Sequence, residues 1–206
     1  MAQGFLKGNR IGIIVAGLIF LGSFWYLVNV AFKSQDVFSA SNAELGAIYD
    51  AVFHTSKGDF TIQFYPSKAP QTRKNFLSLA STGFYDDTKF HRVIKDVLIQ
   101  GGDPYTKRSD VSRYGTGDPG YFIKDEINDI PMKRGVVAMA HKGEKNSAGS
   151  QFFVLAGDRP DLQGKFTVFG FVSGGMDTID AISRVPVSGN ERPSTPVILQ
   201  SIDLRE

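Results

Sequence analysis

An unbroken apolar run sets the first part of the chain apart from the rest. Residues 11–32 (IGIIVAGLIFLGSFWYLVNVAF) are 22 consecutive residues without a charge. A helix of this length rises about 33 Å, which is enough to cross the roughly 30 Å hydrocarbon core of a bilayer. Trp25 and Tyr26 lie toward its far end, where aromatic rings favour the membrane interface. The pattern predicts one transmembrane helix, followed by a polar tether at residues 33–47.

The flanking charges predict the orientation of this span. Lys7 and Arg10 precede it and Lys33 follows it, so we expect residues 1–10 to be cytoplasmic and the remainder to be extracytoplasmic. The alternative is a cleaved signal peptide, because Ser39-Ala40-Ser41 offers small residues for cleavage. The apolar run exceeds the roughly 7–15 residues of a signal peptide's hydrophobic region. We therefore expect a single-pass membrane protein that keeps its anchor, rather than a secreted one.

Beyond residue 47 the apolar positions come in short runs that predict strands. Ala51–Thr55 and Asp59–Tyr65 are separated by three residues that include Gly58, which favours a hairpin. Further strands are expected at Val93–Gln100, Val136–Ala140, Gln151–Leu155, Thr167–Val172 and Val197–Leu204. Pro70–Ser81 and Met176–Ser183 are predicted to be helices, the first with Pro70 in its opening turn. Many short strands with two helices favour a closed or nearly closed antiparallel barrel over residues 48–206.

Composition excludes several classes of function. The chain has no cysteine, so it forms no disulfides, thiolate metal sites or cysteine nucleophiles. After Lys7, Arg10 and Lys33, the other 20 basic residues (23 less these three) balance 21 acidic ones, which argues against nucleic-acid binding. Three histidines without an H-E-x-x-H motif predict no metal, and Ser150 lacks the hydrolase elbow. No cofactor is implied. The acidic residues Asp125, Glu126 and Asp129 are interpreted as a solvated loop.

One apolar stretch carries polar residues that a simple core strand would not need. In FHRVIKDVLIQGGDP (90–104), Arg92 and Gln100 are eight residues apart, which on one strand places both side chains on the same face. The even spacing indicates either a wet surface or a binding site. Further on, Phe152 is expected in the core, and Phe153 should then point to the opposite face.

The order of five motifs resembles the cyclophilin-type peptidyl-prolyl isomerases. After FHRVIKDVLIQGGDP come YGTGDPGY (114–121), GVVAMAHKG (135–143), GSQFFVLAG (149–157) and LQGKFTVFGFV (162–172). The likeness runs from about Ala51 to Leu204. It implies an eight-stranded antiparallel barrel capped by two helices, and an isomerase that accelerates X-Pro rotation in folding proteins.

The resemblance also implies which residues carry the site. Arg92 would donate a hydrogen bond to the proline nitrogen of the twisted amide, Gln100 would hold the substrate backbone, and Phe153 would form the floor under the proline ring. The implied substrate-binding residues are Val97, Leu98, Gly115, Ala140, His141, Gln151, Asp161, Leu162 and Phe166. The implied partners are proline-containing segments of client proteins, together with the membrane through residues 11–32.

Some positions depart from the family pattern. Val97 stands where an aromatic residue is expected, Asp161 where an aromatic residue, often Trp, lines the pocket, and Phe166 where His is common. His141-Lys142 replaces a typical Asn-Ala, and the following loop is one residue longer. These changes predict an active enzyme with weaker or differently selective binding. The alternative is a catalytically weak or inactive binding module that docks into a membrane complex.

Overall fold

The computed structural model describes residues 48–206. The predicted cytoplasmic segment 1–10, membrane span 11–32 and tether 33–47 lie outside the described residues. Within residues 48–206, no helix is both long and apolar enough to cross a bilayer.

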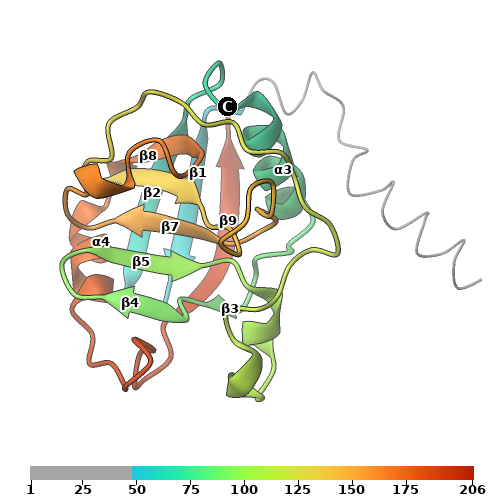
Figure 1. Cartoon of the computed structure of the whole chain (residues 1–206). Coiled ribbons are helices and arrows are strands. Elements are labelled where there is room, and N and C mark those ends of the chain that lie inside the picture. Colours follow the sequence, from blue (N-terminus) through green and yellow to red (C-terminus); the bar gives the residue numbers. More distant parts are fainter. Residues whose placement is uncertain (1–47) are drawn as a thin grey trace, which may run out of the picture. The chain divides into compact units, whose positions relative to one another are not determined.

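The described strands form one antiparallel sheet of nine strands in the order β3-β9-β1-β2-β8-β6-β7-β5-β4. Their bounds are β1 Asp50–Thr55, β2 Gly58–Phe64, β3 Thr88–Lys89, β4 Arg92–Ile94, β5 Leu98–Gly101, β6 Val136–Met139, β7 Phe152–Leu155, β8 Val168–Gly174 and β9 Ile198–Arg205. The outer strands β3 and β4 are separated in the chain only by Phe90 and His91. The Phe90 N–H donates to the Val197 carbonyl (3.0 Å) and the His91 N–H to the Gln100 carbonyl (3.1 Å). These two residues therefore join the edges of the sheet, which curls into a barrel (Figure 1).

The predicted hairpin and both predicted helices are confirmed. β1 and β2 pair from Asp50↔Gln63 to Thr55↔Gly58. Helix α3 spans Pro70–Ser81, with Pro70 in its first turn, and helix α4 spans Met176–Ser183. Helix α3 packs on β8 and β9, whereas α4 packs on β2, β4 and β5. The two helices thus cover opposite sides of the barrel (Figure 1).

The single strand predicted for Val93–Gln100 is wrong. The chain reverses between β4 and β5, and Arg92 lies directly opposite Gln100 in an antiparallel pair. Asp96 adopts φ +55°, and the Val97 N–H donates to the Ile94 carbonyl (3.0 Å) to close the turn. The turn contains no Gly or Pro and is flanked by apolar residues. The sequence therefore looked like one continuous strand. Because opposite residues of an antiparallel pair share a face, Arg92 and Gln100 still lie together. Dividing this strand turns the seven strands predicted from the apolar pattern into the eight implied by the resemblance, and the two-residue β3 is the ninth.

A distant carboxylate caps helix α3. Ala69, which precedes the helix, provides no side-chain cap. The Glu126 carboxylate accepts hydrogen bonds from the N–H groups of Gln71 (3.1 Å) and Thr72 (2.7 Å) and from the Thr72 hydroxyl (2.8 Å). The interpretation of Glu126 as a solvated loop residue is therefore wrong. It satisfies backbone donors that every helix leaves open at its first turn.

The two faces of β7 belong to different apolar clusters. Phe152 is fully buried inside the barrel against Phe53, Phe76 and Tyr85. Phe153 is directed to the other face, where it packs with a cluster that includes Leu98. The alternation expected for neighbouring strand residues is confirmed, and the outer face of this strand is available to line a site.

Candidate active site

A groove of about 830 Å³ lies over β4, β5 and β7. Its walls also take residues from two short 3₁₀ helices, η2 (Val111–Arg113) and η3 (Pro160–Leu162), and from the loop before β9. The lining residues are His91, Arg92, Ile94, Leu98, Gln100, Val111, Ser112, Tyr114, Gly115, Ala140, His141, Gly143, Phe153, Arg159, Leu162, Phe166, Asn190 and Arg192. Nine of the twelve residues implied by the sequence motifs line it: Arg92, Leu98, Gln100, Gly115, Ala140, His141, Phe153, Leu162 and Phe166.

Arg92 is held at the edge of the groove by a carboxylate. Its Nε donates to Glu191 Oε2 at 2.6 Å, and both side chains are slightly less than half exposed. Glu191 has φ +57°, and its carbonyl accepts the Val93 N–H (2.7 Å), which ties its loop to β4. The sequence motifs did not indicate Glu191, because it follows Arg92 by 99 residues in a loop without a motif. The contact uses Nε, so the Nη groups of Arg92 can reach into the groove.

Gln100 is the first member of an amide network. Its Nε2 donates to Gln151 Oε1 at 3.0 Å, and Gln151 Nε2 donates to the carbonyls of Gly115 (3.0 Å) and Gly117 (2.8 Å). Gly115 has φ +86°, a conformation that suits glycine, and its N–H donates to the buried Asp103 carboxylate. The network fixes the glycine loop against β5 and orients the amide of Gln100.

The floor of the groove is aromatic and aliphatic. The Phe153 ring meets the Phe166 ring edge-on, with centroids 5.1 Å apart, and Phe166 stacks on His141 at 4.6 Å. Leu98 is also buried in this cluster, and Leu162 packs against it. The Ala140 N–H donates to the Gln151 carbonyl (2.9 Å), so this backbone donor is already used within the protein. The floor can hold a small apolar ring by contact alone.

Three residues implied by the motifs do not line the groove. Val97 lies in the β4–β5 turn and packs beneath the floor. Gln151 accepts the hydrogen bond from Gln100 but does not itself line the groove. Asp161 accepts hydrogen bonds from Arg159 Nε (2.8 Å) and Nη2 (2.6 Å), which hold the pKa of its carboxyl group below the usual value. The wall that was expected at Asp161 is therefore provided by Arg159, which the motifs did not indicate.

The comparisons with known proteins identify the family. The family model for cyclophilin type peptidyl-prolyl cis-trans isomerases matches residues 51–204. This chain belongs to the cyclophilin family. Peptidyl-prolyl cis-trans isomerase-like 1 of Neurospora crassa is 43% identical to this cyclophilin over 151 residues, which cover 72% of this chain and 89% of that protein. A peptidyl-prolyl cis-trans isomerase of Synechococcus elongatus is 45% identical over 120 residues, which cover 58% of this chain and 77% of that protein.

A solved structure agrees with these relatives. The crystal structure of a Cryptosporidium parvum cyclophilin type peptidyl-prolyl cis-trans isomerase superimposes on this cyclophilin with a TM-score of 0.71 at 31% identity, covering 77% of this chain and 98% of that one. The protein is a peptidyl-prolyl cis-trans isomerase. The relatives' names favour this enzyme over the alternative of an inactive binding module.

The groove of this cyclophilin also contains residues that the family resemblance did not assign to the site. His91, Tyr114 and Arg192 line it, together with Val111 and Asn190. Burial lowers the pKa of the His91 imidazole and outweighs the opposing effect of the nearby Asp103 carboxylate, so the ring is neutral at pH 7. In residues 48–206, no group of three or more His, Asp or Glu side chains is arranged to hold a metal ion.

Proposed function

We propose that Arg92 is the catalytic group of this isomerase and that it donates a hydrogen bond to the proline nitrogen of the twisted X-Pro amide. The observation that carries the proposal is its position. Arg92 lies at the edge of the groove, directly opposite Gln100 in the β4–β5 pair, and both residues share the groove with Phe153.

The reaction requires only a better fit to the twisted amide than to the planar one. Amide resonance sets a rotation barrier of about 18–20 kcal/mol. Twisting the bond removes that resonance and returns a lone pair to the proline nitrogen, which can then accept a hydrogen bond. An interaction made only in the twisted state lowers the barrier. A guanidinium provides such a donor and keeps its positive charge.

The surroundings of Arg92 suit this role. Glu191 engages Nε at 2.6 Å, which restricts the rotation of the guanidinium while the Nη groups remain for the substrate. Gln100 is oriented by Gln151, so its amide is placed to hold the substrate backbone. Phe153 and Phe166 hold the pyrrolidine ring through apolar contact, while the residue before proline turns. No bond is broken and no proton is transferred.

The test is the rate of cis-trans exchange in X-Pro peptides, measured by NMR exchange spectroscopy with the full chain in a nonionic detergent. Arg92→Ala should reduce kcat/KM by about a hundredfold, which corresponds to roughly 3 kcal/mol of lost transition-state stabilisation. Arg92→Lys should recover little, because a lysine lacks the planar guanidinium fork.

Arg184→Ala is the matched control. Arg184 also donates from Nε to a half-exposed carboxylate, Asp96 Oδ1 at 2.7 Å, but it does not line the groove. The control should exchange peptides like the parent. Equal rates for Arg92→Ala and the parent would overturn the assignment of Arg92.

We further propose that the pocket is differently selective from that of typical family members. Arg159, held by its hydrogen bonds to Asp161, forms a polar wall where the family pattern has an aromatic side chain. The expected consequences are a higher KM for short peptides and weak binding of the cyclic-peptide drug that many members bind. Calorimetric titration with that drug is the direct measurement, and submicromolar binding would contradict this proposal.

We also propose that residues 11–32 anchor the enzyme with its isomerase domain outside the cytoplasm, where it assists the folding of exported chains. The support is the uncharged run of 22 residues and its flanking charges. Alkaline carbonate should leave the full chain in the membrane fraction, and protease added to intact spheroplasts or sealed vesicles of known orientation should degrade the domain from the extracytoplasmic side only. Release by carbonate would contradict the anchor, and protection from outside would contradict the orientation.

A further inference from the structure

A second cavity opens beside the groove. It has a volume of about 170 Å³ and is lined by Lys89, Phe90, His91, Val111, Tyr114, Arg192, Pro193, Ser194 and Pro196; we call it the side cavity. Four of these residues, His91, Val111, Tyr114 and Arg192, also line the groove. A peptide whose proline lies in the groove would therefore bring a neighbouring side chain to the side cavity.

Cationic side chains line both cavities, and no acidic side chain of residues 48–206 balances them there. Among residues 48–206, no Asp or Glu lines either of them, whereas Arg92, Arg159 and Arg192 line the groove and Lys89 and Arg192 line the side cavity. Arg92 is paired with Glu191 and Arg159 with Asp161. In the part of the chain that the structure describes, Arg192 has no ion pair. The adjacent carboxylate of Glu191 is directed to Arg92 instead.

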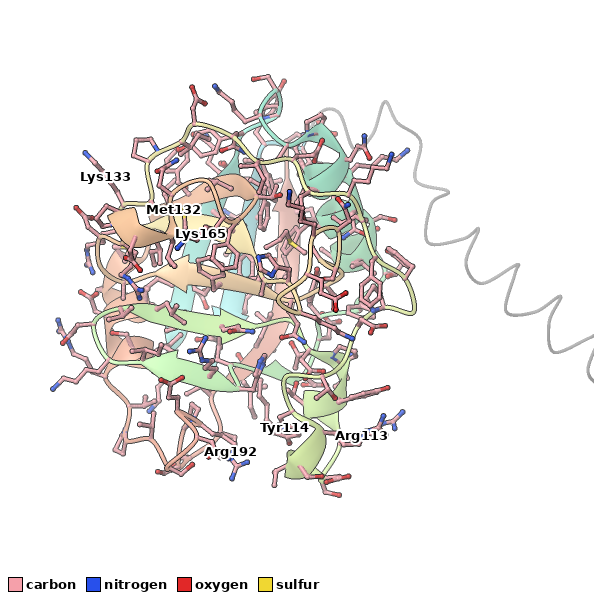
Figure 2. The ribbon with its side chains drawn as sticks, viewed as in Figure 1. Arg113, Tyr114, Met132, Lys133, Lys165 and Arg192 are labelled. Atoms are coloured by element: carbon pink, nitrogen blue, oxygen red, sulfur yellow. The ribbon has the colours of Figure 1, made fainter. Side chains whose placement is uncertain are left out.

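The walls of the side cavity are well held. The Arg192 carbonyl accepts the N–H (2.8 Å) and hydroxyl (3.2 Å) of Ser188, which fixes the backbone of its loop. The Tyr114 hydroxyl lies within hydrogen-bonding distance of the carbonyls of Arg108 (2.8 Å) and Thr106 (3.2 Å), and Lys89 lies over the Tyr114 ring at 5.8 Å. Figure 2 shows Arg192 on the loop before β9 and Tyr114 directly after the neighbouring 3₁₀ helix η2. The cavity thus combines apolar walls with an unpaired cation at the boundary with the groove.

We propose that Arg192, assisted by Lys89, forms an anion-binding subsite that selects client segments with an acidic side chain close to the proline. This inference rests on the proposed function, because it assumes that the groove binds the proline. The methylene groups of a Glu side chain would contact Val111 and Pro193, while its carboxylate would accept hydrogen bonds from the Arg192 guanidinium. A charge-assisted hydrogen bond of this kind is stronger than a neutral one.

The test is a positional scan. A short peptide with a single X-Pro bond is prepared with Glu, or with the uncharged isostere Gln, at each of the three positions on either side of the bond. Exchange catalysis and binding are measured by NMR for the full chain in a nonionic detergent. At one position Glu should increase kcat/KM and affinity about threefold to tenfold over Gln, and added salt should reduce the gain. A phosphoserine peptide at that position shows whether phosphate is preferred to carboxylate.

Two variants assign the effect to Arg192. Arg192→Gln should abolish the difference between Glu and Gln, and Arg192→Glu should transfer the preference to a Lys peptide. Arg113→Gln is the matched control because it removes the same charge nearby. Arg113 lies over the Tyr105 ring and lines neither cavity, and it is on the far side of Tyr114 from Arg192 in Figure 2. The control should keep the parent's preference.

The outcomes separate the subsite from the catalytic proposal. Equal binding and turnover of Glu and Gln peptides at every position would overturn the subsite and leave the role of Arg92 intact. A preference that survives in Arg192→Gln would also overturn it. An Arg192-dependent preference in binding, without any catalysed exchange, would support the subsite and contradict the catalytic proposal alone.

Discussion

Phe152 and Phe153 are neighbours on β7, but the first contributes to the core and the second to the groove. Phe152 is fully buried against aromatic rings inside the barrel, whereas Phe153 lines the groove on the other face of β7. The sequence motif G-S-Q-F-F-V cannot separate the two by composition. Because successive side chains of a strand point to opposite faces of the sheet, Phe152 faces the core and Phe153 faces the groove.

Substitutions at these two positions should therefore have different signatures. Phe152→Leu is expected to reduce the free energy of unfolding by about 1–3 kcal/mol, because part of its aromatic packing is lost, with little change in kcat/KM of the folded protein. Phe153→Leu should mainly raise KM. Urea unfolding and NMR exchange on both variants check this, and an unchanged KM in Phe153→Leu would argue against its role as the floor.

The Gln151 side chain supports the site without lining the groove. It receives a hydrogen bond from Gln100 and donates to two glycine carbonyls. Gln151→Leu should cost about 1–3 kcal/mol of stability, because the two carbonyls are left without this partner, and should lower kcat through a less ordered Gln100. Gln151→Glu keeps the acceptor but loses the donor, so it tests the carbonyl contacts separately. Parent-like kcat in Gln151→Leu would contradict this account.

At the scale of elements, helix α3 depends on a residue outside it. Glu126 accepts three hydrogen bonds at the first turn of the helix. Glu126→Ala should lower the free energy of unfolding by about 1–2 kcal/mol, measured by urea denaturation. Asp129→Ala, which removes the exposed pair with Lys68, is the control and should stay within about 0.5 kcal/mol of the parent. A similar loss in both variants would indicate general electrostatics rather than capping.

Strand β1 carries a pH-dependent bridge to both of its neighbours. His54 Nδ1 lies 3.0 Å from Asp59 on β2, and Nε2 lies 3.2 Å from Asp203 on β9. Desolvation lowers the pKa of His54, but hydrogen bonds and attraction from the two carboxylates together outweigh it and raise the pKa. The charged histidine therefore binds its proton more tightly in the folded state.

The sign of the pH effect follows from this shift. A raised folded pKa stabilises the protein fully below the unfolded value of about 6.5, and the contribution is lost as pH rises through the folded pKa. The stability deficit of His54→Gln should thus be larger at about pH 5 than at about pH 8.5, as measured by urea unfolding at both values. A deficit that grows with pH would contradict the assignment.

At the scale of the molecule, the sheet closes into a barrel because a two-residue connection joins its edge strands β3 and β4. Its two edge strands are joined by Phe90 and His91, and one continuous sheet includes every described strand. A single core of this kind should unfold cooperatively. Far-UV circular dichroism, which follows the sheet, and near-UV dichroism, which follows the aromatic cluster, should give the same urea midpoint for residues 42–206. Separate midpoints would indicate an independently unfolding part.

The sequence alone determined the elements whose signals are local. The hairpin needs only two alternating runs and a glycine turn, and Pro70–Ser81 and Met176–Ser183 need only periodicity and end signals, so the bounds of both helices agree with the structure. The ordered motifs also indicated the family, together with the groove residues Arg92, Gln100 and Phe153.

Only the tertiary structure decided how distant segments meet. The reversal at Asp96 lacks a Gly or Pro signal, and the pairing of Arg92 with Glu191 joins positions 99 residues apart. Arg192 lines the groove from the same loop, whereas Val97 and Asp161 do not line it. Periodicity and turn chemistry act over a few residues, whereas these contacts depend on how the barrel closes, so no local pattern in the sequence encodes them.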